Sequence, residues 1–255
     1  MDLDIKGLRV LVTAGAGGIG LAIARRFAGE GARVHVCDVD DAAIAAIDPA
    51  ITRTHCDVSD RAQVKRLFED VQARLGGLDV LVNNAGIAGP TSKIEDMNPE
   101  DWDRCLEVCL TGQFNCTRLA VPLLRQSRDA SIVNISSAAG KVGFAMRAPY
   151  AAAKWGVIGL TKSLSIELGP DRIRVNAILP GLVAGDRQRR VLEAKAQQRG
   201  ISFAEMERIA FSYTSIKDYV TPEQIADQIL FLCSPRGKTI SGQAISICGD
   251  TQMLG

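Results

Sequence analysis

Short apolar runs rich in Val, Ile and Leu alternate along the chain with segments of helical period. The runs expected to form strands cover residues 8–14, 32–38, 51–58, 78–86, 130–137, 173–181 and 243–249. The expected helices cover residues 19–31, 59–77, about 98–125, 150–168 and 222–234. Strands that are apolar on both faces and separated by helices predict a parallel sheet covered by helices on each side. With right-handed crossovers, this order gives a doubly wound, Rossmann-like α/β fold.

One domain is enough to account for the whole chain. A length of 255 residues is ordinary for a single α/β domain, and the sequence contains no repeat or low-complexity tract. The most polar stretch, residues 184–221, has a composition too helical for a linker. We therefore predict a single domain over residues 1–255, in which residues 184–221 form a flap over the substrate.

Charge, hydropathy and cysteine content exclude several classes of protein. A net charge of +1 gives no basis for binding nucleic acid or an acidic membrane surface. The sequence contains no apolar run of about 18 residues, the length that a helix needs to span a bilayer, and the start MDLDIKG lacks the apolar region of a signal peptide. Seven cysteines without a C-x-x-C pair favour a reduced, cytoplasmic protein. Cys105 and Cys109 are expected to be buried thiols, so no metal site is predicted.

A glycine-rich loop, TAGAGGIG, joins the first expected strand to the first helix and can be read in two registers. One is G-x-G-x-x-G with Gly15, Gly17 and Gly20, and the other starts at Thr13 and has Ala14 in its first glycine position. In either register, backbone N–H groups and a helix N-terminus face a phosphate. A left-handed alanine costs about 1–2 kcal/mol. We therefore expect a negative φ at Ala14, with Gly15 taking any positive φ.

Polar residues end the next three expected strands. They are Asp38, Asp57 and the segment Asn83-Asn84-Ala85-Gly86, and ligands bind at the carboxyl ends of strands in such sheets. Asp38 is placed to accept hydrogen bonds from the adenosine ribose. Asp57 can bind the adenine amino group, or it can simply cap a turn. Because a carboxylate at Asp38 repels a 2′-phosphate, the sequence predicts NAD rather than NADP.

The candidate catalytic residues are Ser137, Tyr150 and Lys154. Tyr150 and Lys154 are four residues apart on an expected helix and therefore share one face. A phenol with a pKa of about 10 is a poor base, but a neighbouring ammonium stabilises its phenolate. Ser137 ends the fifth expected strand, where its hydroxyl can bind the substrate oxygen whose charge changes.

With these motifs in place, the chain resembles the short-chain dehydrogenase/reductase family over almost its full length. The matching positions are Thr13, Gly18-Ile19-Gly20, Asp57-Val58, Asn83 to Gly86, Ser137, Tyr150, Lys154, Arg174 to Gly181 and Ser241-Gly242-Gln243. The resemblance implies that Tyr150 is the acid/base, that Lys154 lowers its pKa and holds the nicotinamide ribose, and that Ser137 binds the substrate oxygen. It also implies a homo-oligomer, a tetramer, assembled through the helices expected at about 100–125 and 150–168.

A larger set of residues is implied in cofactor binding. These residues are Thr13, Gly15, Gly18, Ile19, Gly20, Asp38, Asp57, Val58, Asn83, Ala85, Gly86, Tyr150, Lys154, Pro180, Gly181 and Val183. Pro180, Gly181 and Val183 are expected along the nicotinamide, with Val183 near its carboxamide.

Three positions depart from the family pattern. Ala14 replaces a glycine, and Cys248-Gly249-Asp250 replaces the usual Asp-Gly-Gly near the C-terminus. Cys109 stands where the family usually has an asparagine that completes a catalytic tetrad. That asparagine supports a relay water largely through its backbone carbonyl, which a cysteine retains. We therefore expect an active enzyme with a perturbed relay, and no nucleophilic role for Cys109.

Arginines near the expected reaction centre bear on the substrate. Arg147 precedes Tyr150 by three residues, and Arg187 opens the flap together with Arg189 and Arg190. Arginine binds carboxylates in a bidentate manner, although most of these side chains can equally be solvated. Arg147 and Arg187 are the predicted substrate-binding arginines, beside Ser137 and Tyr150.

The flap is also similar to that of family members that oxidise sugar acids. We therefore expect NAD-dependent oxidation of a secondary alcohol on a small, anionic hydroxy acid. A 2-keto-3-deoxy sugar acid is one example, as for a 2-keto-3-deoxy-L-fuconate 4-dehydrogenase. A 3-oxoacyl carrier-protein reductase or a hydroxysteroid-type dehydrogenase is the alternative. A non-catalytic NAD-binding sensor is the alternative from a different class.

Overall fold

Seven parallel strands form one sheet in the computed structural model, which describes residues 3–254. The strand order is β3-β2-β1-β4-β5-β6-β7, as expected for a doubly wound sheet. The strands are β1 (Arg9–Thr13), β2 (Arg33–Asp38), β3 (Thr52–His55), β4 (Val80–Asn83), β5 (Ala130–Ile135), β6 (Ile173–Pro180) and β7 (Ala244–Ile247). The order reverses between β1 and β4, and the crevice at that point is where such sheets bind ligands.

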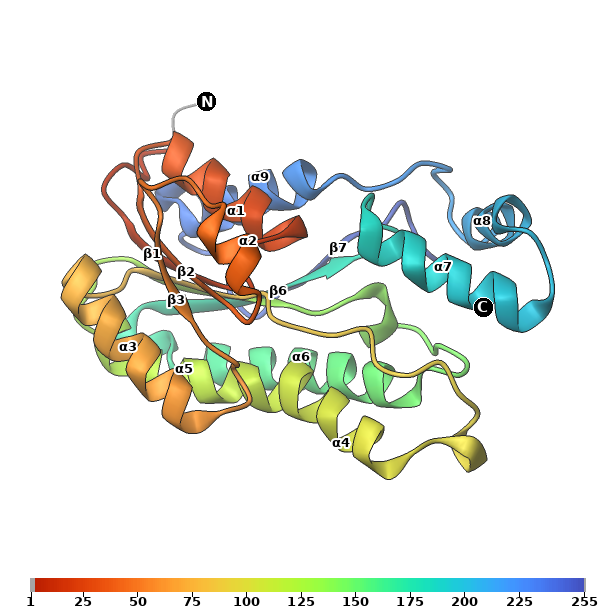
Figure 1. Ribbon diagram of the computed structural model, residues 1–255. Helices are drawn as coiled ribbons and strands as arrows, with labels where there is room; N and C mark the ends of the chain where they lie inside the picture. Colours follow the sequence, from red (N-terminus) through yellow and green to blue (C-terminus); the bar gives the residue numbers. More distant parts are fainter. Residues whose placement is uncertain (1–2, 255) are drawn as a thin grey trace.

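Helices cover both faces of the sheet (Figure 1). One face carries α1 (Gly18–Gly29) and α9 (Pro222–Cys233), and the other carries α3 (Arg61–Leu75), α5 (Gly112–Leu124) and α6 (Ala148–Glu167). Because successive strand residues point to opposite faces, Val10 and Val12 of β1 pack in the core under α1. Leu11, between them, packs in the core under α3 and α5. No helix in the described range, residues 3–254, is long and apolar enough to cross a membrane.

The expected helix at 98–125 is divided into three parts. It consists of α4 (Pro99–Leu106), a π-helical segment η2 (Glu107–Thr111) and α5. The added residue per turn in a π-helix cannot be detected from apolar periodicity, which is why the sequence predicts one continuous helix. A short helix, α2 (Asp41–Ala45), was not predicted either.

Residues 184–221, predicted to be a flap, contain two helices. They are α7 (Asp186–Arg199) and α8 (Phe203–Ser212), and both lie beyond the carboxyl ends of the strands (Figure 1). The two helices pack against each other through a small core of their own, which includes Leu192, Ala196 and Met206.

The predicted backbone conformation at Ala14 is wrong. Ala14 has φ +48°, whereas Gly15 is not among the residues with positive φ; the loop's other positive φ, +51°, is at Gly18. The amide of Asn84 donates to the carbonyl oxygens of Thr13 (3.0 Å) and Ala14 (2.9 Å). These two bonds hold both carbonyls at the end of β4, and they stabilise a conformation that alanine alone disfavours.

Candidate active site

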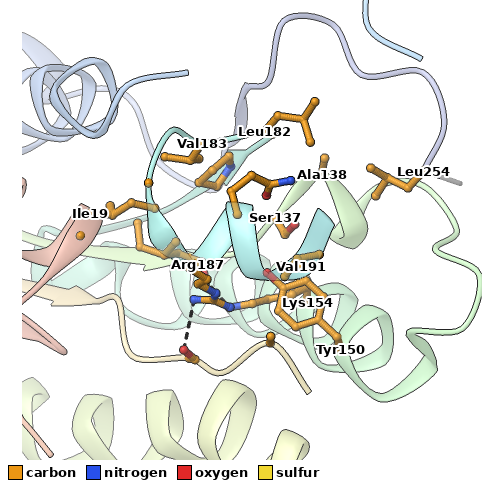
Figure 2. A pocket seen from close by; sticks show the side chains of 18 of the residues that line it. Ile19, Ser137, Ala138, Tyr150, Lys154, Leu182, Val183, Arg187, Val191 and Leu254 are labelled. Atoms are coloured by element: carbon orange, nitrogen blue, oxygen red, sulfur yellow. Dashed lines mark hydrogen bonds between the residues drawn. The ribbon is translucent and has the colours of Figure 1, made fainter. Parts of the chain in front are cut away.

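A cleft of about 490 Å³ lies at the carboxyl ends of the central strands. The glycine loop and Asp38 line one part of it, and residues of β5, α6 and α7 line the other. Figure 2 shows Ile19 and Val183 toward one side of this cleft and Ser137, Tyr150 and Lys154 toward the other, with Arg187 of the flap between them. The cleft therefore joins the segment expected to bind a cofactor to the segment expected to carry the reaction.

The glycine loop is built for close approach to a ligand and to its own helix. Gly17 precedes the first turn of α1 in an extended conformation, which leaves the N-terminal N–H groups of that helix facing the cleft. A Cβ on Gly20 would lie 2.1 Å from the carbonyl oxygen of Ala14, and one on Gly15 would lie 2.7 Å from Val36. The loop and the helix N-terminus thus fit a pyrophosphate group.

Asp38 ends β2 at the edge of the cleft. Its carboxylate accepts hydrogen bonds from the backbone N–H groups of Ala16 (3.0 Å) and Val39 (2.8 Å). These bonds orient a negative charge toward the place where the ribose of a dinucleotide bound at the glycine loop would lie.

Two residues predicted to contact the cofactor instead connect strands. The hydroxyl oxygen of Thr13 accepts hydrogen bonds from the N–H groups of Asn84 (2.9 Å) and Ala85 (3.0 Å). The amide of Asn83 is buried and donates to Thr117 (3.0 Å) and Asn134 (2.9 Å). Neither lines the cleft, whereas Asn84 does. Thr13 and Asn83 therefore hold the ends of the strands that carry the site, and they do not line the cleft themselves.

Asp57 does not line the cleft, and its carboxylate has protein partners. It pairs with Arg104 (2.7 Å) and accepts hydrogen bonds from the hydroxyl (2.7 Å) and N–H (2.9 Å) of Ser59. Burial alone would raise the pKa of Asp57, but the hydrogen bonds from Ser59 and Arg104 outweigh it and lower the pKa. Val58 packs in the core, where a Cβ on Gly112 would come within 2.5 Å of it. An adenine contact at Asp57 stays a prediction.

Ser137, Tyr150 and Lys154 lie around one end of the cleft (Figure 2). The Ser137 hydroxyl oxygen accepts a hydrogen bond from the N–H of Ala139 (3.1 Å), so its own hydrogen can be donated into the cleft. Lys154 is only 2 % exposed. Its Nζ donates to the carbonyl oxygen of Ile135 (2.9 Å) and lies 5.6 Å from the centre of the Tyr150 ring. The ammonium is thus held beside the phenol.

Cys109 lies in η2, directly behind the segment that follows β4. Its Sγ accepts a hydrogen bond from the N–H of Ile87 (3.4 Å) and donates to the carbonyl oxygen of the same residue (3.5 Å). A hydrogen bond from Cys105 lowers the pKa of Cys109; burial opposes this, and the charge of Lys154 adds to it. The thiol is therefore hydrogen-bonded to both backbone groups of Ile87.

Arg147 also lines the cleft, and it is 2 % exposed. One of its Nη groups donates to the carbonyl oxygen of Ala88, while its Nε has no hydrogen-bond partner within the described part of the chain, residues 3–254. Its Cζ lies 5.2 Å from the centre of the Phe144 ring and 5.3 Å from that of Tyr150. Burial lowers the pKa of Arg147, and the charge of Arg187 contributes to this shift.

Three basic residues of α7 line the same cleft, namely Arg187, Arg190 and Lys195. Arg187 is exposed and donates to the carbonyl oxygen of Gly86 (3.2 Å), a bond drawn in Figure 2. Lys195 is 8 % exposed, and its Nζ lies 4.2 Å from the centre of the Phe144 ring. Burial and the charge of Arg147 lower the pKa of Lys195 to about 8. Lys195 and Phe144 were not predicted to line the site, although Arg187, Val191 and Lys195 are spaced four apart along one helix face.

Pro180, Gly181 and Val183 line the cleft where β6 ends, and their contact with the nicotinamide stays a prediction. A Cβ on Gly181 would lie 2.7 Å from the Cα of Cys248. The cysteine that departs from the family pattern is therefore packed directly against the end of β6.

Comparisons with known proteins agree with this arrangement. Residues 14–249 match a family model described as enoyl-(acyl carrier protein) reductase. The chain is 36% identical to the 3-oxoacyl-(acyl-carrier-protein) reductase of Thermotoga maritima, with 97% of this chain and 98% of the relative covered. It is 34% identical to the D-beta-hydroxybutyrate dehydrogenase of Cupriavidus necator, with 93% and 95% covered.

Solved structures are similar over nearly the whole chain. An NAD+-bound xylitol dehydrogenase has a TM-score of 0.92 at 27% identity, covering 96% of this chain and 99% of that one. A variant of actinorhodin polyketide ketoreductase with NADPH has a TM-score of 0.89 at 33% identity, covering 98% of each chain. Both forms of nicotinamide cofactor thus occur among similar structures.

Proposed function

Because the chain belongs to the short-chain dehydrogenase/reductase family, we propose that it oxidises a secondary alcohol of a small, polar hydroxy acid with NAD. A 2-keto-3-deoxy sugar acid is an example of such a substrate. The chain is an oxidoreductase that acts on CH–OH groups, as its relatives are. The observation that carries the proposal is the grouping of Ser137, Tyr150 and Lys154 at the end of the cleft opposite the glycine loop.

Each of the three side chains has a distinct task in the proposed reaction. A bound nicotinamide cofactor would accept the hydride in oxidation and supply it in reduction. The Tyr150 phenolate takes the proton from the carbinol oxygen, and in reduction the phenol returns it. Lys154, with Nζ 5.6 Å from the ring centre, stabilises the phenolate. The Ser137 hydroxyl donates a hydrogen bond to the same oxygen while its charge changes.

We propose NAD as the preferred cofactor because of Asp38. Its carboxylate is fixed by two backbone N–H groups at the edge of the cleft and would lie beside a 2′-phosphate. A like-charge contact of this kind costs on the order of 3 kcal/mol, which corresponds to roughly a 100-fold difference in affinity. Comparing kcat/KM for the two cofactors tests this, and equal values would contradict it.

The proposal that the substrate is an acid is supported by the cations that line the cleft and by the name of one similar protein. Arg147, Arg187 and Lys195 all face the cleft, and the relative from Cupriavidus necator is named for a hydroxy acid. A second candidate is reduction of a 3-oxoacyl carrier-protein thioester, favoured by the 36% identity to such a reductase.

A substrate screen separates the two candidates. Hydroxy acids and sugar acids are incubated with NAD, and acetoacetyl thioesters with the reduced cofactor, while the absorbance of reduced nicotinamide is followed. We expect turnover of at least one acid and little of the thioesters. Efficient reduction of the thioesters, with no acid oxidised, would favour the second candidate.

We further propose a cytoplasmic homotetramer. Its location is supported by the seven unpaired cysteines, and its assembly by the exposed Phe114 on α5 and Trp155 and Ile166 on α6. Light scattering at micromolar concentration tests the assembly, and a monomer would contradict it.

A further inference from the structure

We propose that Arg147 is the binding site for the carboxylate of the substrate, so that the enzyme takes the ionised acid and discriminates against its neutral ester. This inference rests on the proposed function and makes it more specific. It assigns the charged end of the substrate to one side chain, and it predicts that the charge itself is required.

Arg147 is a buried cation that forms no ion pair with an Asp or Glu of the described residues, 3–254. It is 2 % exposed, burial lowers its pKa, and the charged groups that also shift this pKa are Tyr150, Arg187, Cys105 and Cys109. Burying a charge without an opposite charge is costly. A carboxylate arriving with the substrate would supply the missing charge.

The hydrogen bonds of Arg147 leave room for a ligand. One Nη group is used by the carbonyl oxygen of Ala88, while the buried Nε has no partner among the described residues, 3–254. A buried N–H without an acceptor is destabilising. A carboxylate oxygen at Nε would satisfy this donor with a charge-assisted hydrogen bond.

The local backbone holds Arg147 toward the cleft. The preceding residue, Met146, has φ +63°, which is unusual for a side chain of this size. The carbonyl oxygen of Met146 accepts a hydrogen bond from Ser92 (2.9 Å), and the N–H of Arg147 donates to Phe144 (3.2 Å). These bonds stabilise the tight turn that precedes α6 and places the guanidinium inside.

Arg147 is close enough to the reaction centre to bind one end of a small substrate. Its Cζ lies 5.3 Å from the centre of the Tyr150 ring, whose hydroxyl takes the proton from the carbinol. Arg187 and Lys195 add positive charge to the same cleft, and the acid on α7 that lines it, Asp186, is exposed to solvent. A single planar guanidinium matches a carboxylate in shape and charge.

The test uses the full-length protein with NAD and two matched substrates: the best hydroxy acid from the screen and its methyl ester. Arg147→Gln removes the charge and Arg147→Lys keeps it. Arg189→Gln is the control, because Arg189 is an exposed α7 arginine that pairs with Glu193 and does not line the cleft. A charged hydrogen bond contributes about 1.5–3 kcal/mol, or roughly 10- to 150-fold.

We expect Arg147→Gln to lower kcat/KM for the acid by a factor in that range, mainly through KM, and to leave the ester unaffected. Arg147→Lys should retain part of the preference for the acid, and Arg189→Gln should retain all of it. An unchanged KM for the acid in Arg147→Gln would overturn the proposal. Equal losses for acid and ester would overturn it too, since Arg147 would then only support Ala88.

A binding measurement separates this inference from the proposed function. Sodium propionate should raise the melting temperature of the wild-type complex with NAD, and should fail to do so for Arg147→Gln. This result would support the anion site even if no hydroxy compound were oxidised, in which case the proposed function alone would fail. If Arg147→Gln does not fold, Arg147→Lys decides: equal losses of kcat/KM for acid and ester in a folded, NAD-binding Arg147→Lys, with the propionate effect unchanged, would overturn the proposal.

Discussion

The left-handed conformation of Ala14 leads to a prediction about stability. Replacing this residue by glycine removes the clash of Cβ that makes φ +48° unfavourable, which is a gain of about 1–2 kcal/mol. The greater freedom of glycine in the unfolded chain offsets about 0.4–1 kcal/mol of that gain. The hydrogen bonds from Asn84 to the carbonyls of Thr13 and Ala14 are retained in the variant. We therefore expect Ala14→Gly to stabilise the fold by about 1 kcal/mol, or about 2–4 °C in Tm for a domain of this size.

Gly18→Ala is the matched opposite change. Gly18 has φ +51°, and a Cβ there would meet no atom within 4 Å, so backbone strain is the only effect. We expect a loss of stability of similar size, about 1 kcal/mol. Urea unfolding without cofactor, followed by circular dichroism at fixed protein concentration, measures both variants. If Ala14→Gly is no more stable than the wild type while Gly18→Ala is tolerated, the strain argument is refuted.

Three further changes test other parts of the structure. Burial alone would raise the pKa of Asp79, but the hydrogen bonds from Arg9 lower it. The ion pair between the two residues therefore stabilises the fold above about pH 4. This stabilisation is lost as the pH falls through the lowered pKa of Asp79. Asp79→Asn should lower the free energy of unfolding by about 2 kcal/mol at neutral pH. In urea unfolding, the difference in this free energy between variant and wild type should shrink in acid, and a difference that stays constant would contradict this. Gly20→Ala would place Cβ 2.1 Å from the carbonyl oxygen of Ala14 and should abolish NAD binding in a fluorescence titration. An unaltered affinity for NAD would show that the loop can shift to accommodate the methyl group. Cys109→Asn should change turnover by less than about tenfold, because a cysteine and an asparagine can each form hydrogen bonds with the backbone of Ile87. Each such bond contributes about 1 kcal/mol. A gain in turnover of several orders of magnitude would show that the wild-type site is defective.

The features predicted correctly depend on patterns local in sequence. Apolar strands and helical periods are local signals, and they predict the parallel sheet and the helices on its two faces. The four-residue spacing of Tyr150 and Lys154 is local as well, and the structure brings both to the cleft together with Ser137. The position of the glycine loop between the first strand and the first helix is a local signal too, although the backbone conformation inside the loop was predicted wrongly.

The features that were missed depend on residues distant in sequence. Ala14 is left-handed because of hydrogen bonds from Asn84, 70 residues further along the chain. Asp57 pairs with Arg104, 47 residues away, and this pairing changes what its carboxylate can bind. No pattern within one segment shows such contacts. The burial of Arg147 without an ion-pair partner among residues 3–254 is likewise visible only once α6, α7 and the segment after β4 are in place.

Removing one oxygen atom from Tyr150 tests the central claim most directly. Tyr150→Phe keeps the ring beside Arg147 and Lys154 but leaves no group to exchange the proton. We predict that kcat for the best hydroxy acid falls by roughly 100- to 10,000-fold, while NAD titrated by fluorescence binds as in the wild type. Turnover at the wild-type rate in a variant that binds NAD normally would contradict the assignment of the reaction to this site.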